Sequence, residues 1–129
     1  MHRGIFITAC LLGALSVVLG AFGAHSLKNI LSVQQLVTFE TAVRYQFYHV
    51  FALMFVALLY PQFSRRLMLF AGWSFISGII LFCGSLYLLT YVQVSGHTGS
   101  KWLGPVTPVG GLAFITGWIM MAVAAIKKN

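Results

Sequence analysis

The sequence predicts an all-α, polytopic membrane protein, a four-transmembrane-helix bundle with an interfacial extension on the second helix. Sixty per cent of its 129 residues are hydrophobic and only 7% are charged, whereas an average soluble domain is about 25% charged. A soluble domain of this length leaves much of its surface in water. The apolar residues also gather in four long runs. Lipid is therefore the expected solvent, and residues 1–129 form one membrane domain without repeats or linkers.

The four runs predict spans at about 4–24, 42–60, 67–91 and 106–126. A helix needs about 20 residues to cross the hydrocarbon core. The first run contains no charge, and the third is long enough to cross with some tilt. Because a backbone in lipid must satisfy its own hydrogen bonds, each run is expected to be helical.

The second helix is expected to begin before its apolar part. Ser32 and Gln35 have the spacing of a capping box, which starts a helix. Apolar residues then recur at helical intervals with polar residues between them. One helix is therefore predicted from about Val33 to Tyr60, with its first turns at the membrane interface. Pro61 should end it.

The fourth span opens after Gly104-Pro105 and carries Pro108, which we place in its first turn. Proline is tolerated there because the first amides of a helix have no partner inside the helix. The preceding connection, residues 92–105, is rich in turn-forming Gly and Ser.

The net charge of +7 does not indicate a nucleic-acid-binding protein. Eight Lys and Arg face a single acid, Glu40, and the bases are scattered between apolar runs instead of clustering on one face. Bases in such positions orient a membrane protein and meet anionic headgroups. The side with both termini and the middle connection holds five bases, and the other side holds Lys28, Arg44 and Lys101. The positive-inside rule then places both termini in the cytoplasm.

The N-terminus has a second interpretation, as a signal peptide that ends at a small-residue cleavage site in the stretch Ala21-Phe22-Gly23-Ala24. The apolar stretch is longer than a usual signal-peptide core. Cleavage would also leave three spans and would remove the excess of basic residues on the side that holds both termini. A retained first span is therefore the prediction.

Small residues indicate how the helices meet. They recur every three or four residues in three of the runs: Ala9, Gly13, Ser16, Gly20 and Ala24; Ser74, Gly78 and Ser85; Gly110, Ala113 and Gly117. Lipid gives no hydrophobic drive between helices, so close backbone approach holds a bundle together. Packing within the chain is the first interpretation and a homodimer seam the second. Cys10 and Cys83 are expected at different depths in the membrane, too far apart for a disulfide. Both are predicted to be small apolar residues that pack against their neighbours.

Polar residues near the outer end of the bundle are the candidate ligand-binding residues: His25, Glu40, Arg44, Tyr45, Tyr48 and His49. Glu40 and Arg44 have the i, i+4 spacing of an ion pair. Histidines on neighbouring helices are able to hold a haem iron or to line a quinone headgroup pocket. The other interpretation is an interfacial belt of Tyr, His and Arg at headgroup level. His97, in the third connection, lies on the same side.

No catalytic residue and no metal site is predicted. The sequence has no Gly-rich phosphate loop, no Asp, no carboxylate pair and no nucleophile elbow. It also lacks the tight ligand spacing of a zinc site. An enzyme is therefore not expected, and the cofactor is unknown.

Four blocks of the sequence resemble a known family. They are Gly20–His25, Thr41–His49, Gly84–Leu88 and Gly104–Phe114. In this order they resemble the YgdD/YwdK-like bacterial membrane proteins, the "domain of unknown function 423" family. The resemblance covers nearly the whole chain and implies a four-span inner-membrane protein, with no settled activity. The polar positions that match the blocks, or in the case of Glu40 directly precede one, are His25, Glu40, Arg44, Tyr45, Gln46, His49, Ser85, Tyr87 and Thr107.

Three functions follow as hypotheses. The first is a structural or interaction component of the membrane, with lipid, a second copy of the chain or another membrane protein as its partner. The second is a binder of haem or a quinone-like lipid near His25 and His49. The third is a minimal oligomeric transporter that uses Glu40 as its coupling group, although Arg44 nearby favours a permanently ionised Glu40.

Overall fold

The computed structural model describes residues 1–97 and 99–127, which form helices and short connections. The long helices are α1 (Arg3–His25), α2 (Val33–Leu59), α3 (Arg65–Gly78), α4 (Gly84–Val94) and α5 (Leu103–Ile126). A π-helical segment, η2 (Ile79–Cys83), joins α3 to α4 into one rod, and the short helices η1 (Leu27–Asn29) and η3 (Ser100–Trp102) lie in the connections. Four helical stretches in the described residues are long and apolar enough to cross a membrane, which confirms the predicted fold class. Lys128, which the charge count above includes, lies outside the described residues.

The first helix is capped by its own N-terminal residues. The backbone N–H of Ile5 donates to Nδ1 of His2 over 3.2 Å. The backbone N–H of His2 in turn donates to the carbonyl of Ala57 over 2.8 Å. His2 therefore starts α1 and also fastens it to the last turns of α2. The helix ends within one residue of the predicted limit.

The predicted capping box of α2 is confirmed. The backbone N–H of Gln35 donates to Oγ of Ser32 over 3.2 Å, and the backbone N–H of Ser32 donates to Oε1 of Gln35 over 3.0 Å. The helix then runs unbroken to Leu59, just before Pro61. A single helix thus joins the polar first turns to the apolar span, as expected.

The start of α5 differs from the prediction. The helix begins at Leu103, so Pro108 lies inside it and not in its first turn. The reason is that η3 leads directly into the helix, which puts Pro105 in the first turn, where a missing N–H costs little. Leu103 is 2% exposed and anchors this earlier start.

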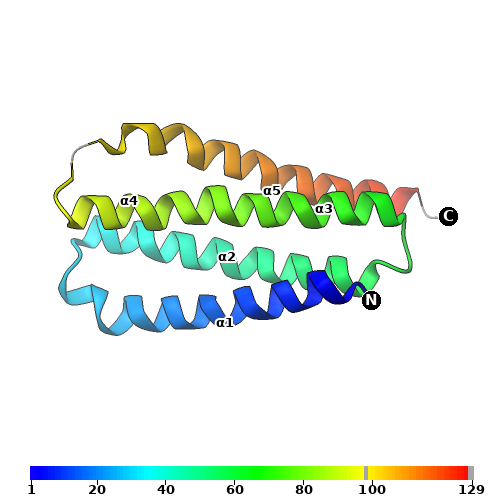
Figure 1. Ribbon diagram of the computed structural model, residues 1–129, viewed down its shortest axis with the longest axis horizontal. Coiled ribbons are helices and arrows are strands. Elements are labelled where there is room, and N and C mark those ends of the chain that lie inside the picture. The colour runs from blue at the N-terminus through cyan, green and yellow to red at the C-terminus, as the bar shows by residue number, and fades with distance from the viewer. Residues whose placement is uncertain (98, 128–129) are drawn as a thin grey trace.

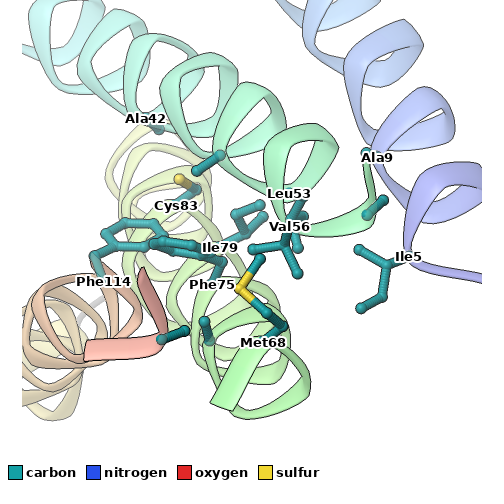
Figure 2. Close-up of a cluster of buried hydrophobic side chains, with 14 residues drawn as sticks. Ile5, Ala9, Ala42, Leu53, Val56, Met68, Phe75, Ile79, Cys83 and Phe114 are labelled. Carbon is teal, nitrogen blue, oxygen red and sulfur yellow. The ribbon is translucent and has the colours of Figure 1, made fainter. Parts of the chain in front are cut away.

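The helices are arranged around a central pair, which consists of α2 and the α3–η2–α4 rod. Figure 1 shows α1, α2, the α3–η2–α4 rod and α5 side by side, with both termini and the α2–α3 turn at one end. The N-terminal end of α1 also reaches the rod, because Ile5 lies against Gly72. On the other side α5 reaches α2, because the rings of Phe114 and His49 stack. The core between these helices is built around Phe75, Leu53, Val56, Met68 and Cys83 (Figure 2).

Small residues pack within the chain, as the first interpretation predicts. A Cβ at Gly13 or Gly20 would lie 3.3 Å from Val50 or 3.5 Å from Val43 of α2. On the other side of the bundle, added Cβ atoms on Gly78, Gly110 and Gly117 would collide with Phe114, Phe82 and Phe75, respectively.

One member of the α1 set was assigned wrongly. Ala24 is exposed, and Gly23 is buried against the ring of Phe39 instead. The helical face turns by 100° per residue, so the inward position moves by one at the end of a long helix. Both cysteines are free: Cys83 is buried in the core, whereas Cys10 is exposed on α1.

Candidate functional site

The depth of His49 follows from the register between α1 and α2. In this antiparallel pair Gly13 lies against Val50, and Gly23 lies against Phe39. His49 is therefore level with the middle of α1, whereas His25 is its last residue. At about 1.5 Å per residue the two histidines are about 16 Å apart along the bundle axis. The structure therefore does not bring the two histidines together.

His49 is instead held between α2 and α5. It is 5% exposed. Its Nδ1–H donates to the carbonyl of Tyr45 over 2.7 Å, and its Nε2 accepts from the indole N–H of Trp118 over 3.3 Å. Because a carbonyl only accepts and an indole N–H only donates, these partners fix a neutral imidazole with the proton on Nδ1. The ring also stacks on Phe114, with centroids 3.5 Å apart.

A groove lies beside this histidine. It has a volume of about 420 Å³, and it is lined by α2, η2 and α5 through Tyr45, His49, Phe82, Gly111, Phe114, Ile115 and Trp118. Its walls are mostly aromatic. The imidazole nitrogens are already bonded to the protein, so a ligand entering the groove would first meet ring faces.

A second buried polar group joins three helices. Gln46 of α2 is 2% exposed. Its Nε2 donates to the carbonyl of Leu12 in α1 over 3.1 Å, and its Oε1 accepts from the hydroxyl of Tyr87 in α4 over 2.8 Å. The same Leu12 carbonyl also accepts from Oγ of Ser16 over 2.8 Å. A side-chain amide that bonds a backbone carbonyl on one helix and a hydroxyl on another fixes both the depth and the rotation of α2.

A third polar contact joins α4 to α5. The hydroxyls of Ser85 and Thr107 lie 2.6 Å apart, and Ser85 also donates to the carbonyl of Phe82 over 2.9 Å. Thr107 is therefore the donor in the pair. No buried side-chain nitrogen or oxygen in residues 1–97 and 99–127 lacks a partner.

Several of these residues are absent from the candidate set drawn from the sequence: Gln46, Tyr87, Ser85, Thr107 and Trp118. Four of them are polar positions of the blocks that resemble the family. Polar side chains in transmembrane helices generally face protein rather than lipid. That rule would have directed attention to Gln46 and Tyr87.

The remaining candidate residues face outward. Glu40, Arg44 and Tyr48 are exposed on α2, and His25 is exposed at the end of α1. Although both side chains lie within the described part of the chain, Glu40 and Arg44 form no ion pair with each other. An exposed pair stabilises a protein by only about 0–1 kcal/mol, so each side chain is free to take another partner. Tyr45 is 38% exposed and stacks on Phe82, with centroids 4.7 Å apart.

Glu40, Arg44 and Tyr48 belong to a longer exposed row, which we call the α2 stripe. Its members recur every three or four residues: Val33, Val37, Glu40, Arg44, Tyr48, Phe51, Phe55 and Leu58. The register with α1 puts Arg44 about 9 Å below the level of His25. A charged residue therefore faces outward within the apolar part of the bundle.

The described residues contain no group of three or more His, Cys, Asp or Glu that could hold a metal ion. The buried polar side chains have hydrogen-bond partners inside the bundle, whereas Glu40, Arg44 and Tyr48 are exposed on the α2 stripe. The arrangement thus has a bonded interior and a polar outer surface on one helix.

Comparison with known proteins identifies the family. Residues 19–111 match the model of a family described as "Protein of unknown function (DUF423)". The chain is 45% identical over 114 residues to the UPF0382 membrane protein YwdK of Bacillus subtilis, with 88% of each chain covered. It is 41% identical over 121 residues to the UPF0382 membrane protein SAB0533 of Staphylococcus aureus, covering 91% of this chain and 93% of the relative. No solved structure matches it. The chain belongs to the DUF423 family of membrane proteins, whose function is unknown.

Proposed function

We propose that this protein is a non-enzymatic, multi-pass component of the bacterial inner membrane that works through helix–helix contact, and that its partner is a second copy of the same chain. The observation that supports this is the α2 stripe, which presents Glu40 and Arg44 outside the bundle. The closed interior leaves the outer faces of the helices as the surfaces for interaction.

The residues of the α2 stripe are of the kinds found where one transmembrane helix packs against another. Charged residues in transmembrane helices are costly in lipid and almost always face protein. Spacings of three and four residues are those of a helix-packing seam. Tyr48, Phe51 and Phe55 continue the stripe with aromatic rings, which are enriched at interfaces. A partner helix would therefore remove both an exposed charge and exposed aromatic surface from lipid.

The stripe is also complementary to itself. Two copies related by a two-fold axis along the membrane normal place their α2 helices side by side and parallel. Glu40 and Arg44 are one helical turn apart, about 6 Å, a distance that an arginine side chain spans. Glu40 of each copy then pairs with Arg44 of the other. This pairing explains why Glu40 and Arg44 lie on the same stripe and yet form no ion pair within one chain.

Charge reversal tests this pairing. We expect Glu40→Arg and Arg44→Glu each to weaken self-association in vesicles about tenfold, because each places like charges opposite one another. The double variant should regain association to within about twofold of the unaltered protein. Energy transfer between labelled copies at fixed protein-to-lipid ratios measures the association.

Lys28→Glu, which reverses a charge outside the stripe, serves as the control and should leave association unchanged. A double variant that associates no better than either single variant would rule out the reciprocal pairing. If labelled copies of the unaltered protein showed no energy transfer, the proposed homodimer would be ruled out.

We also propose that both termini face the cytoplasm. Arg3, Arg65, Arg66 and Lys127 belong to the end that holds both termini and the α2–α3 turn (Figure 1). A reporter fused after Asn129 is expected to be active only if it functions inside the cell. Activity of a reporter that works only outside would reverse the topology and leave the fold unchanged.

The other two hypotheses gain less from the geometry. A bis-histidine haem site needs His25 and His49 at one depth, and the helix register separates them by about 16 Å. A quinone-like ring has the groove beside His49, but the nitrogens of that histidine are bonded to Tyr45 and Trp118. A transporter that uses Glu40 needs this side chain in a water-filled path through the bundle, and Glu40 is exposed on the outside of α2.

A further inference from the structure

Two apolar grooves flank α3 at the end that holds both termini. The first, about 270 Å³, lies between α1 and α3 and is lined by His2, Ile5, Thr8 and Ile76 among others. The second, about 500 Å³, lies between α3 and α5 and includes Arg66, Phe70 and Met120. Leu69 and Trp73 line both grooves. These two side chains therefore form a ridge with a groove on either side.

The mouth of the grooves is positively charged. Arg66 lines the second groove, and Arg3, Arg65 and Lys127 belong to the same end of the bundle. The single acid of the chain, Glu40, lies in the first turns of α2, toward the opposite end. An anion at this mouth would meet basic groups and no described carboxylate.

The N-terminus of α3 adds hydrogen-bond donors at the same place. Ser64 stands at the N-cap position, but its side chain makes no capping hydrogen bond. The first amides of a helix have no partner within it, and together with the helix dipole they favour an anion. The chain thus presents backbone donors beside the Arg66 side chain.

The depth of the grooves matches one leaflet. Together the two grooves follow α3 from Arg66, in the second groove, to Ile76, in the first. These residues are ten positions apart, which corresponds to about 15 Å of helix, half the thickness of the hydrocarbon core. Acyl chains lying in the grooves would therefore end near the middle of the bilayer. A free phosphate ion would leave these apolar walls uncovered.

We propose that this surface binds an anionic diacyl phospholipid. One acyl chain lies in each groove, astride the Leu69–Trp73 ridge, and the phosphate binds Arg66 and the N-terminal amides of α3. The site is lined by no residue of the α2 stripe, so it is independent of the proposed pairing of two copies.

Quenching of Trp73 tests the site. Trp73 is 65% exposed, and bromine atoms on lipid chains in the grooves would lie beside its ring. The protein is placed in vesicles that contain brominated phosphatidylglycerol or brominated phosphatidylcholine. The Trp73 signal is the difference between the unaltered protein and Trp73→Phe. We expect the anionic lipid to bind at least about fivefold more tightly, because one basic group near the membrane surface contributes about this factor.

Arg66→Gln should reduce the preference for the anionic lipid about fivefold, whereas Lys101→Gln, which removes one charge at the other end, should not change it. Single-chain lysophosphatidylglycerol should compete at least about tenfold less well than the diacyl lipid at equal mole fraction, because it fills one groove. Equal quenching by the two brominated lipids would overturn the proposal. So would an equal effect of the two charge variants, and equal competition by the single-chain lipid would overturn the use of both grooves.

Discussion

Gly110→Ala is expected to lower the free energy of unfolding by about 3 kcal/mol, at the upper end of the usual cost of overpacking. A Cβ at this position would collide with the backbone nitrogen of Phe82, in the π-helical segment. Backbone atoms have no alternative rotamer, so α5 must move away from the rod. Unfolding of the detergent-solubilised protein with increasing sodium dodecyl sulfate, followed by circular dichroism, measures the loss.

The neighbouring glycine is a matched control. A Cβ at Gly111 would lie 3.8 Å from the ring of Phe82, an ordinary contact. Gly111→Ala should leave stability unchanged or raise it by up to about 1 kcal/mol, because alanine favours helix more than glycine does. A similar loss in both variants would mean that Gly110 matters for reasons other than the close approach of the two helices.

Gln46→Leu is expected to cost about 1–2 kcal/mol of stability. The substitution leaves the hydroxyl of Tyr87 without its partner inside the bundle, and an unpaired buried polar group costs about this much. The Leu12 carbonyl is less affected because it still accepts from Ser16. The same unfolding titration measures the change.

A double-mutant cycle separates this hydrogen bond from packing effects. Tyr87→Phe removes the hydroxyl and keeps the ring, so the Gln46→Leu, Tyr87→Phe double variant leaves no unpaired hydroxyl at this contact. We expect it to cost about 1 kcal/mol less than the sum of the two single variants. Strictly additive losses would contradict a contact between the two side chains.

Much of the fold was predictable because lipid restricts what a backbone can do. An apolar run of about 20 residues in hydrocarbon has to be a helix, and α1 and α2 begin and end within one residue of the predicted limits. Ser32 and Gln35 fixed the start of α2 through local hydrogen bonds. These features depend on near neighbours in the chain, which a sequence displays directly.

Features that depend on helix rotation were not predictable. Periodicity alone does not show whether His49 faces α1 or α5, and it is the contact with Trp118 that places it against α5. The partners of Gln46 lie 34 and 41 residues away in the chain. The π-helical segment changes the rotation of α4 relative to α3 within an evenly apolar run. No local residue pattern in the sequence predicts this segment.

The proposed function depends most on contact between two copies through the α2 stripe. Counting photobleaching steps of single fluorescent copies, reconstituted at low density in lipid vesicles, tests it most directly. Two steps per particle for the unaltered protein, and one for Arg44→Glu, are the predicted results. One step per particle for the unaltered protein, at densities where the expected dimer persists, would contradict the account.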